Sequence, residues 1–344
     1  SVTHVLIIIC HHCTEIGPYM HTKCPYCSGK IYHFGGRRRR CSQCGRTWSV
    51  RPQKRGRKPL RTGPNLPRLI LLERHNARQL VPRYDCSAAT LRYRAREHMR
   101  VIAERPGQLL IPEGDLVLLV DGLWSTFQDH YWVLYNMAVK PVTENVAYLL
   151  DPVQRCGRED ARGWDAAIST IPGEIKERIR ALFSDGLPGF ETIAQRQGWI
   201  NQFCHRHLIA SVESKLGRHR RQLGSRWLRE RIYAAVCDAL ATTDEHQLGL
   251  LEEQLQQLIG RWDCTRRLRW TVTQFLRLKD SFRAYLRHPD LRLPITTGSL
   301  ESLHSLLRVA IGTVNNPEST FLRATAFIRL RRTITCNGPI LQQN

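Results

Sequence analysis

The pattern of apolar and polar residues changes several times along the chain and predicts strands and helices in a mixed order. Between about residues 115 and 150, short apolar runs favour three adjacent strands: DLVLLVDGLW, His130–Val139 and Asn145–Leu150. Two later runs, IRALF and WINQF, predict further strands, with helical patterns between the strand groups. This order predicts an α/β domain on a mixed sheet that begins with antiparallel strands.

Residues 207–290 have apolar residues at helical spacing almost throughout, so we interpret this segment as an all-helical insertion. The segment LPITTGSLESLHSLLRVAIG predicts a helix that begins near Glu301, with Thr297 or Ser299 as its cap. FLRATAFIRLRRTITC, at Phe321–Cys336, is expected to close the core. Within the insertion, one helix face is predicted to be buried and contains Leu248, Leu251, Leu255, Leu258, Ile259 and Trp262.

Residues 68–108 also have a helical pattern, in two parts that are separated at Asp85, Cys86 and Ser87. Serine is a good N-cap, so we expect the second helix to begin just after Ser87. The segment is either a helix-turn-helix-like DNA-binding element, with its second helix in the major groove, or an ordinary amphipathic helix with a basic solvent face. The second helix has Leu91, Ala95, Met99 and Ile102 on one face and Arg92, Arg96 and Arg100 on the adjacent face.

The charge of the chain is concentrated near its beginning. The formal net charge is +22, and residues 20–100 have 21 Lys and Arg against three acids, which leaves a nearly neutral remainder. This region is rich in Gly, Pro and paired cysteines and lacks the apolar face of a membrane-binding helix, so double-stranded DNA is the expected partner. No apolar run approaches the ~18 residues that a membrane span needs, and no membrane partner is expected.

Two cysteine pairs define a small module at residues 20–50. Cys24 and Cys27 form one C-x2-C pair, and Cys41 and Cys44 form the second after thirteen intervening residues. This spacing predicts a zinc ribbon in which four thiolates hold a structural Zn2+ ion and leave no open position for a reacting water. Between the pairs lies a run of arginines in the expected loop, Arg37, Arg38, Arg39 and Arg40, which either contacts DNA phosphates or is a solvated charge run.

The segments around the ribbon are simpler. Residues 1–19 are expected to be upstream or disordered sequence, and residues 51–67 a basic linker rich in Arg, Lys, Pro and Gly. Within the linker, Arg55-Gly56-Arg57 is similar to an AT-hook core, which enters the minor groove. The remaining cysteines are scattered without a pairing pattern, so a reducing compartment fits the chain best.

Two aspartates stand at the expected ends of buried strands. Asp121 precedes Gly122 in VDGLW, and Asp185 precedes Gly186 in FSDGLPG. A carboxylate in such a place is costly unless it pairs or binds a cation, which makes a metal site a reasonable hypothesis. The alternative is that both aspartates form turns. Glu301 alone is explained as a first-turn partner of the helix dipole.

These residues together resemble the DDE transposases of bacterial insertion sequences, in the Mutator-like group. The resemblance covers about residues 115–332 and rests on the order of Asp121, Asp185, FCHRHL and TTGSLESLHSLLR, with the helical insertion between the last two. It implies an RNase H-like core in residues 109–344 and a catalytic triad that holds Mg2+ or Mn2+. The triad is Asp121, Asp185 and Glu301; Cys204 and His207 support it, with His205 as the competing histidine, and Gly298 stands where the family often has Asn.

The resemblance also implies a function. The chain is expected to bind the ends of an insertion sequence, cleave a DNA strand and transfer it to target DNA, as a homo-oligomer on DNA in the bacterial cytoplasm, associated with the nucleoid. Two alternatives stay open at this point. One is a non-catalytic zinc-ribbon DNA-binding protein, and the other is an RNase H-like nuclease without strand transfer.

Overall fold

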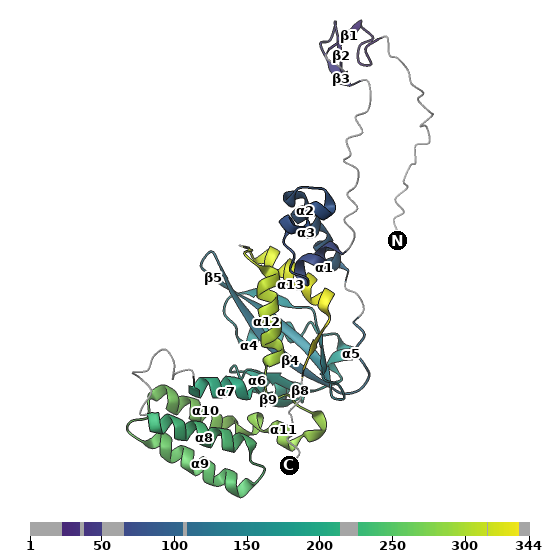
Figure 1. Ribbon diagram of the computed structural model, residues 1–344. Helices are drawn as coiled ribbons and strands as arrows, with labels where there is room; N and C mark the ends of the chain where they lie inside the picture. Colours follow the sequence, from purple (N-terminus) through teal and green to yellow (C-terminus); the bar gives the residue numbers. More distant parts are fainter. Residues whose placement is uncertain are drawn as a thin grey trace, which may run out of the picture. The chain divides into compact units, whose positions relative to one another are not determined.

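The computed structural model describes residues 23–34, 38–49, 65–105, 109–213, 226–314 and 316–336 (Figure 1). The chain divides into two compact units, residues 1–61 and residues 62–344, and each is treated by itself. The predictions on residues 1–19, on Arg37 and on residues 51–64 of the basic linker, with Arg55 and Arg57, lie outside the described residues. The predicted end of the linker at residue 67 is wrong, because a helix begins at Leu66.

The first unit contains a three-stranded antiparallel sheet in the order β1-β2-β3. Its middle strand corrects one expectation, because Arg38, Arg39 and Arg40 are not in a loop but form strand β2 together with Cys41. Strand β2 is held on both sides: Arg40 pairs with Tyr32 on one neighbour and with Thr47 on the other. The arginine side chains therefore alternate across the small sheet. The strands are β1 (Ile31–His33), β2 (Arg38–Cys41) and β3 (Thr47–Ser49).

The second unit is built on a seven-stranded mixed sheet in the order β10-β6-β5-β4-β8-β9, with β7 paired to β5. Strands β4 and β5 form a long antiparallel hairpin, whereas β8 is parallel to β4 and β9 is parallel to β8. The expected α/β class and mixed sheet are therefore confirmed; β7 and β10 were not predicted. The strands are β4 (Leu116–Phe127), β5 (His130–Pro141), β6 (Val146–Leu149), β7 (Val153–Cys156), β8 (Ile179–Ser184), β9 (Ile200–Phe203) and β10 (Thr333–Thr335).

Helices cover both faces of this sheet, because the central strands are apolar on both sides. Along β4, Leu116, Leu118 and Val120 belong to one buried cluster, and Val117 and Leu119 belong to the other. The first cluster includes residues of α4 (Ala161–Ile168), α6 (Phe190–Gln197), α7 (His205–Glu213), α8 (Arg226–Ala241), α9 (Glu245–Gly260) and α10 (Arg266–Phe282). The second includes residues of α12 (Gly298–Ile311) and α13 (Pro317–Arg331), and Figure 1 shows α12 crossing the sheet on this side.

The helical segment near residue 70 shares the second cluster. Its first part is two helices rather than one, because Asn76 starts a new helix with a capping box in which it exchanges hydrogen bonds with Gln79. The predicted cap at Ser87 is confirmed: its Oγ accepts from the Thr90 N–H at 3.1 Å. The three helices are α1 (Leu66–Leu71), α2 (Ala77–Tyr84) and α3 (Ala88–Glu104).

The predicted insertion is helical in its described residues, from α7 through α10 and the short α11 (Ala284–Arg287), followed by the 3-10 turn η2 (Pro289–Leu291). Leu248, Leu251, Leu255 and Leu258 are buried as expected. The prediction for Trp262 is wrong: its exposed fraction is 92%, because α9 ends at Gly260 before the apolar spacing reaches it. The short helix α5 (Gly173–Lys176) precedes β8. No helix among the described residues is long and apolar enough to cross a membrane.

Candidate functional site

The four cysteines of the first unit form one compact group. Their sulfur atoms all lie within 4.8 Å of one another. Cys24 Sγ lies 3.7 Å from Cys44 Sγ, and Cys27 Sγ lies 3.4 Å from Cys41 Sγ. Four thiolates at about 2.3 Å from a tetrahedral Zn2+ would stand about 3.8 Å apart, so the group can bind a metal such as zinc.

Backbone N–H groups from the turn within each C-x2-C pair point at the first sulfur of that pair. The Tyr26 N–H donates to Cys24 Sγ, and the N–H groups of Gln43 and Cys44 donate to Cys41 Sγ. The Cys44 N–H is the main reason why the pKa of Cys41 falls to about 6. At Cys41 the thiolate form that a metal needs is therefore favoured before any metal is bound. At Cys27 a backbone hydrogen bond from Gly29 lowers the pKa, but side-chain hydrogen bonds with Cys41 and the other cysteines, together with burial, outweigh it and raise the pKa to about 12.

The two aspartates are brought together by neighbouring parallel strands of the second unit: Asp121 lies in β4, and Asp185 directly follows β8. Leu119 of β4 pairs with Phe183 of β8, and two residues further along each chain stand Asp121 and Asp185. Asp121 is not at a strand end, as the sequence suggested, because β4 continues to Phe127 in its hairpin with β5. It does lie beyond the last residue of β4 that pairs with β8, and this brings it beside Asp185.

The carboxyl group of Asp121 is in an unfavourable electrostatic position. Its side chain is 13% exposed. Burial, and then the charge of Asp185, raise the pKa of Asp121 from 3.8 to about 7, with smaller contributions from Glu159 and Glu301. His207 partly opposes this rise. The two aspartates and Glu301 are thus brought into one electrostatic neighbourhood, and Glu159 joins them.

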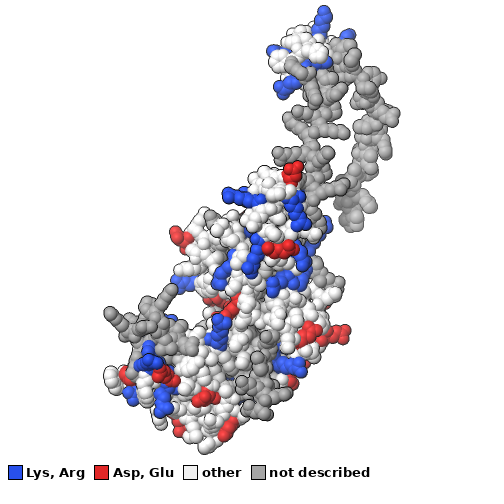
Figure 2. All heavy atoms as spheres, in the orientation of Figure 1, with Lys and Arg blue, Asp and Glu red and all other residues white. Residues whose placement is uncertain are grey.

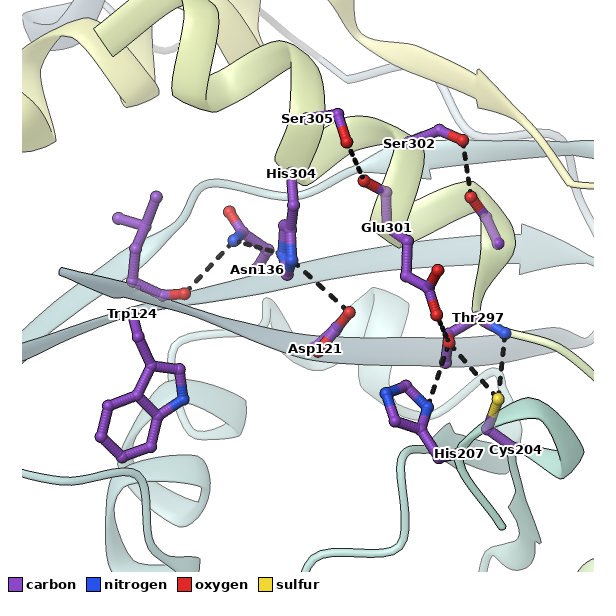
Figure 3. A network of polar contacts seen from close by, with 12 residues as sticks. Asp121, Trp124, Asn136, Cys204, His207, Thr297, Glu301, Ser302, His304 and Ser305 are labelled. Carbon is purple, nitrogen blue, oxygen red and sulfur yellow. Dashed lines mark hydrogen bonds and ion pairs between the residues drawn. The ribbon is translucent and has the colours of Figure 1, made fainter. Parts of the chain in front are cut away.

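Two buried residues hold Asp121 from the side of α12 (Figure 3). The Nδ2 group of Asn136 donates to the Leu134 carbonyl at 3.2 Å and lies 3.0 Å from His304 Nε2. Because Nδ2 is a donor, Nε2 is the acceptor, and the ring proton is on Nδ1, which lies 3.5 Å from Asp121 Oδ2. Burial lowers the pKa of His304 to about 4, so the ring is neutral at pH 7.

The carboxylate of Glu301 is engaged by two other groups. Its Oε1 accepts from the Thr297 hydroxyl at 3.0 Å, and its Oε2 lies 2.9 Å from Arg206 Nη1. Thr297 is at the N-cap position of α12, but its side chain makes no capping hydrogen bond and faces this network instead. Figure 3 shows Glu301 directed toward Thr297, one helical turn from His304.

Cys204 and His207 meet at the same threonine. Thr297 Oγ1 lies 3.3 Å from Cys204 Sγ and 3.3 Å from His207 Nδ1, and the Thr297 N–H donates to Cys204 Sγ at 3.3 Å. Its single hydroxyl proton is directed to Glu301, so Oγ1 accepts from the His207 ring. Hydrogen bonding to Cys204 is the main cause that raises the pKa of His207 to about 9. Burial raises the pKa of Cys204, but the hydrogen bonds from His207 and Thr297 outweigh it and lower that pKa.

The competing histidine is directed elsewhere. His205 Nε2 lies 2.6 Å from the carbonyl oxygen of Phe282, and its ring packs edge-on against Tyr285. Burial lowers the pKa of His205. Of the two histidines in FCHRHL, His207 is therefore the one that joins the carboxylate network.

Glu159 lies on the side of β4 that faces away from α12. Its carboxylate accepts from the indole N–H groups of Trp124 and Trp164, both at 2.8 Å. Burial raises the pKa of Glu159, and Asp185 contributes to the rise. Gly122 makes this position possible, since a Cβ there would stand 2.6 Å from the Glu159 carboxylate. The glycine that follows Asp121 thus has a packing role as well as a place in the motif.

The carboxylates are close but do not form a closed ligand set. Among the described residues, the four cysteines are the one group of three or more metal-ligating side chains whose donor atoms all lie within 4.8 Å. Asp121 is held by His304, Asp185 accepts from the Leu187 N–H at 3.0 Å, and Glu301 is held by Thr297 and Arg206. The geometry is that of separate carboxylates around a shared region.

Five residues of this network were not singled out as site residues from the sequence: Asn136, Glu159, Arg206, Thr297 and His304. One of them had a detectable signal, because His304 is one helical turn after Glu301 and so lies on the same side of the helix. Two more are close in the chain to predicted site residues, since Thr297 is four residues before Glu301 and Arg206 directly precedes His207. Asn136 and Glu159 come from separate elements, and no spacing in the sequence connects them.

The predicted arginine face of α3 is present. Leu91, Ala95 and Met99 are buried, and Arg92 and Arg96 are exposed beside them.

Comparison of the sequence with protein-family models gives no match, and neither does comparison with curated proteins.

Proposed function

We propose that this chain is a DDE transposase, which cleaves and joins DNA strands with a divalent metal. One observation carries the proposal: Asp121 is a nearly buried carboxyl group whose pKa is raised by burial and by Asp185, with Glu159 and Glu301 close enough to add to the effect. A fold retains such a group at a cost in stability, and a bound cation would remove that cost.

The sheet is consistent with the RNase H-like fold that this function needs. Three antiparallel strands, β6-β5-β4, continue into the parallel strands β8 and β9. In the proposed arrangement, Asp121 comes from the central strand, Asp185 from the end of the adjacent strand, and Glu301 from a helix that packs on the sheet. The large helical segment between β9 and α12 is the insertion expected for this group.

The donor set fits Mg2+ or Mn2+ in its chemistry, because it consists of carboxylate oxygens. Asp121 and Asp185 would hold the metal, and Glu301 would join them after leaving Thr297 and Arg206. When bound, a metal pair of this type activates the attacking water or hydroxyl and stabilises the leaving oxygen. The four cysteines offer only sulfur, so they would retain zinc without competing for the same ion.

The protein's own groups position this chemistry. His304 Nδ1 lies 3.5 Å from Asp121 Oδ2 and Asn136 fixes the ring, so in the proposed site one oxygen of Asp121 faces the ring and the other is left for a metal. Thr297 connects Glu301 to His207, whose positive charge offsets part of the local negative charge. Arg206 is 61% exposed and is free to move from Glu301 toward a DNA phosphate.

The proposed reaction has two steps, and the resemblance supports the second. In the first step, water attacks a phosphorus at the element's end, the bond to the 3′-oxygen breaks, and that oxygen takes up a proton. In the second step, the oxygen of the freed 3′-hydroxyl bonds to the phosphorus of a target phosphodiester. The bond from that phosphorus to the target 3′-oxygen breaks, and the released oxygen takes up the proton of the hydroxyl. Joining two ends requires more than one active site, so we propose a homo-oligomer on DNA, held there by the zinc ribbon and the basic helical segment.

The test uses a supercoiled plasmid that carries the genomic DNA on both sides of the coding sequence. With Mg2+ or Mn2+, the full chain should nick the plasmid and form joined products, which are read by gel electrophoresis and sequencing. Asp121→Asn and Asp185→Asn should each abolish both products. The matched control is Asp165→Asn, an exposed carboxylate that pairs with Arg196, and it should retain activity. Full activity in Asp185→Asn would refute the proposal.

A second candidate function is a non-catalytic DNA-binding protein, and one observation favours it: Glu301 is engaged by Arg206 and Thr297 rather than directed at Asp121. In the same assay this candidate predicts DNA binding without nicking in the wild-type chain. The third alternative, an RNase H-like nuclease, predicts metal-dependent nicking without joined products.

A further inference from the structure

A cavity lies between the helical segment α1–α3 and the junction of α12 with α13. Its volume is about 570 Å3. One wall comes from the turn between α1 and α2 and from α3, and the other from the end of α12, the residues that follow it and the first half of α13. Both walls belong to the second unit and share its buried cluster, so the cavity is a fixed part of the fold.

The cavity is strongly basic. Arg74, Arg92, Arg96 and Arg323 line it, together with His75, and no Asp or Glu is among its described lining residues. Arg323 donates to the Ala310 carbonyl at 2.9 Å. The guanidinium groups of the other three arginines make no hydrogen bond or ion pair with another described residue. Figure 2 shows basic side chains gathered on this part of the surface.

The nearest acids in the sequence are already engaged. Glu73 lies beside Arg68 and His75, at 3.9 and 3.8 Å, and Glu97 is 2.7 Å from Arg100. Most of the remaining lining is apolar and includes Met99 of α3 and Val309 of α12; the uncharged polar residues are Asn76, Thr313 and Ser319. Apolar walls around arginines strengthen their attraction to an anion, because they exclude water from the contact.

We propose that this cavity holds the phosphodiester backbone of a DNA strand and places that strand relative to the carboxylates. Arg92 and Arg96 are one helical turn apart, about 6 Å along α3, so they can contact neighbouring phosphates of one strand. DNA is favoured over a free nucleotide because the arginines come from α1–α2, α3 and α13 along an open cavity. The inference deepens the proposed function, since it assigns the partner's docking position.

Helix α12 connects this cavity to the candidate catalytic site. Glu301 is in its first turn, and Val309 lines the cavity eight residues later, which is about 12 Å along the helix axis. At about 3.4 Å per base step, a strand held in the cavity would lie three to four steps from the carboxylates. Binding at the cavity therefore sets which phosphodiester bond reaches Asp121 and Asp185.

The test measures binding of the full, zinc-loaded chain to a fluorescent 30-base-pair duplex from the flanking DNA, without added divalent metal, at several salt concentrations. Arg92→Gln and Arg96→Gln should each lower the slope of log K against log salt by about one, which at 0.1 M salt is about eightfold weaker binding. Arg100→Gln is the control on the same helix, because Arg100 pairs with Glu97 outside the cavity; it should bind within twofold of the wild type.

A variant on the opposite wall separates the cavity from the exposed face of α3. Val309 is 52% exposed, so Val309→Glu should fold, and its new carboxylate should weaken duplex binding about tenfold. Leu250→Glu on α9 adds the same charge at a residue that is 54% exposed and should leave binding unchanged. Unchanged binding in Val309→Glu would overturn the inference, as would displacement of the duplex by micromolar dAMP.

These outcomes are distinct from those of the plasmid assay. If Asp185→Asn abolishes cleavage while the cavity variants bind normally, the proposed function stands and the docking position is wrong. If the cavity variants weaken binding while the wild type cleaves no DNA, the docking position stands and the catalytic proposal is wrong.

Discussion

The two candidate metal sites differ in how they are assembled. The four cysteines come from about twenty residues, and their sulfur atoms lie within 4.8 Å of one another. The carboxylates come from β4, β8 and α12, which are separated by 180 residues between Asp121 and Glu301. Each is held by neighbours such as His304, Thr297 and Arg206 rather than by a common geometry. A local site is preformed by short turns, whereas a site from distant elements depends on the residues that support it.

The largest expected effect is at the cysteine site. Cys27→Ser, or removal of zinc by a chelator, should unfold the first unit, since structural zinc contributes about 10 to 16 kcal/mol to the folding of such modules. The heat-induced transition of residues 62–344 should stay unchanged, because that unit has its own core. Cys156→Ser, at an exposed single cysteine, is the control. Retained zinc stoichiometry in Cys27→Ser would contradict the assignment.

At the carboxylate site, pH should act on stability in two opposite directions. Unfolded chains release the Asp121 proton near pH 4, but the folded protein keeps it to about pH 7, so this group lowers the free energy of unfolding as pH rises through that window. Unfolded chains protonate His304 near pH 6.5, but the folded protein does so at about 4, so this group lowers that free energy as pH falls. The largest change in the free energy of unfolding is about 4 kcal/mol from Asp121 and about 3 kcal/mol from His304.

Denaturant unfolding of two variants separates the two contributions. Relative to the wild type, Asp121→Asn should become more stable as pH rises from 4 to 7, because the opposing His304 contribution is left. His304→Gln should become less stable over the same range, because the Asp121 contribution is left. Equal slopes in both variants and the wild type would show that the two groups are not perturbed as described.

A smaller effect is expected where Glu159 supports the site. The Cβ in Gly122→Ala would displace the Glu159 carboxylate and break its bonds to Trp124 and Trp164, which should lower the free energy of unfolding by about 2 to 3 kcal/mol. Gly249→Ala in α9 meets no atom within 4 Å and should instead raise it by roughly 0.5 to 1 kcal/mol. Equal effects from the two alanines in denaturant unfolding would contradict the role of Gly122.

The smallest effect on stability is expected at Thr297. Thr297→Val keeps the shape but removes the hydroxyl that contacts Glu301, Cys204 and His207, which should cost about 1 to 2 kcal/mol and most of the nicking activity. Thr297→Ser keeps the hydroxyl and should restore most of that activity. If valine and serine gave the same rate in the plasmid assay, the hydroxyl would have no positioning role.

The contrast between the sites also explains what the sequence could predict. Features that depend on neighbours in the chain were predicted correctly. They are the four-cysteine group, the strands β5, β8 and β9, and the cap at Ser87. The position of Asp121 inside β4 depends on the pairing of β4 with β5, and the exposure of Trp262 depends on where α9 ends. Local spacing does not determine either one.

The long-range contacts that support the carboxylates could not be predicted from the sequence for the same reason. Asn136 reaches His304 across 168 residues, and Glu159 reaches Trp124 across 35. Such contacts depend on the order of strands in the sheet and on which helix covers which face. A motif resemblance indicates which carboxylates to examine, but the residues that orient them become visible only in the folded chain.

Mn2+ binding, followed by electron paramagnetic resonance, shows whether Asp121 and Asp185 share a divalent cation. The full, zinc-loaded wild-type chain should bind Mn2+, Asp121→Asn and Asp185→Asn should each lose that binding, and Asp165→Asn should retain it. If the wild type bound no Mn2+, or if Asp185→Asn bound it as the wild type does, the two aspartates would not share a divalent cation.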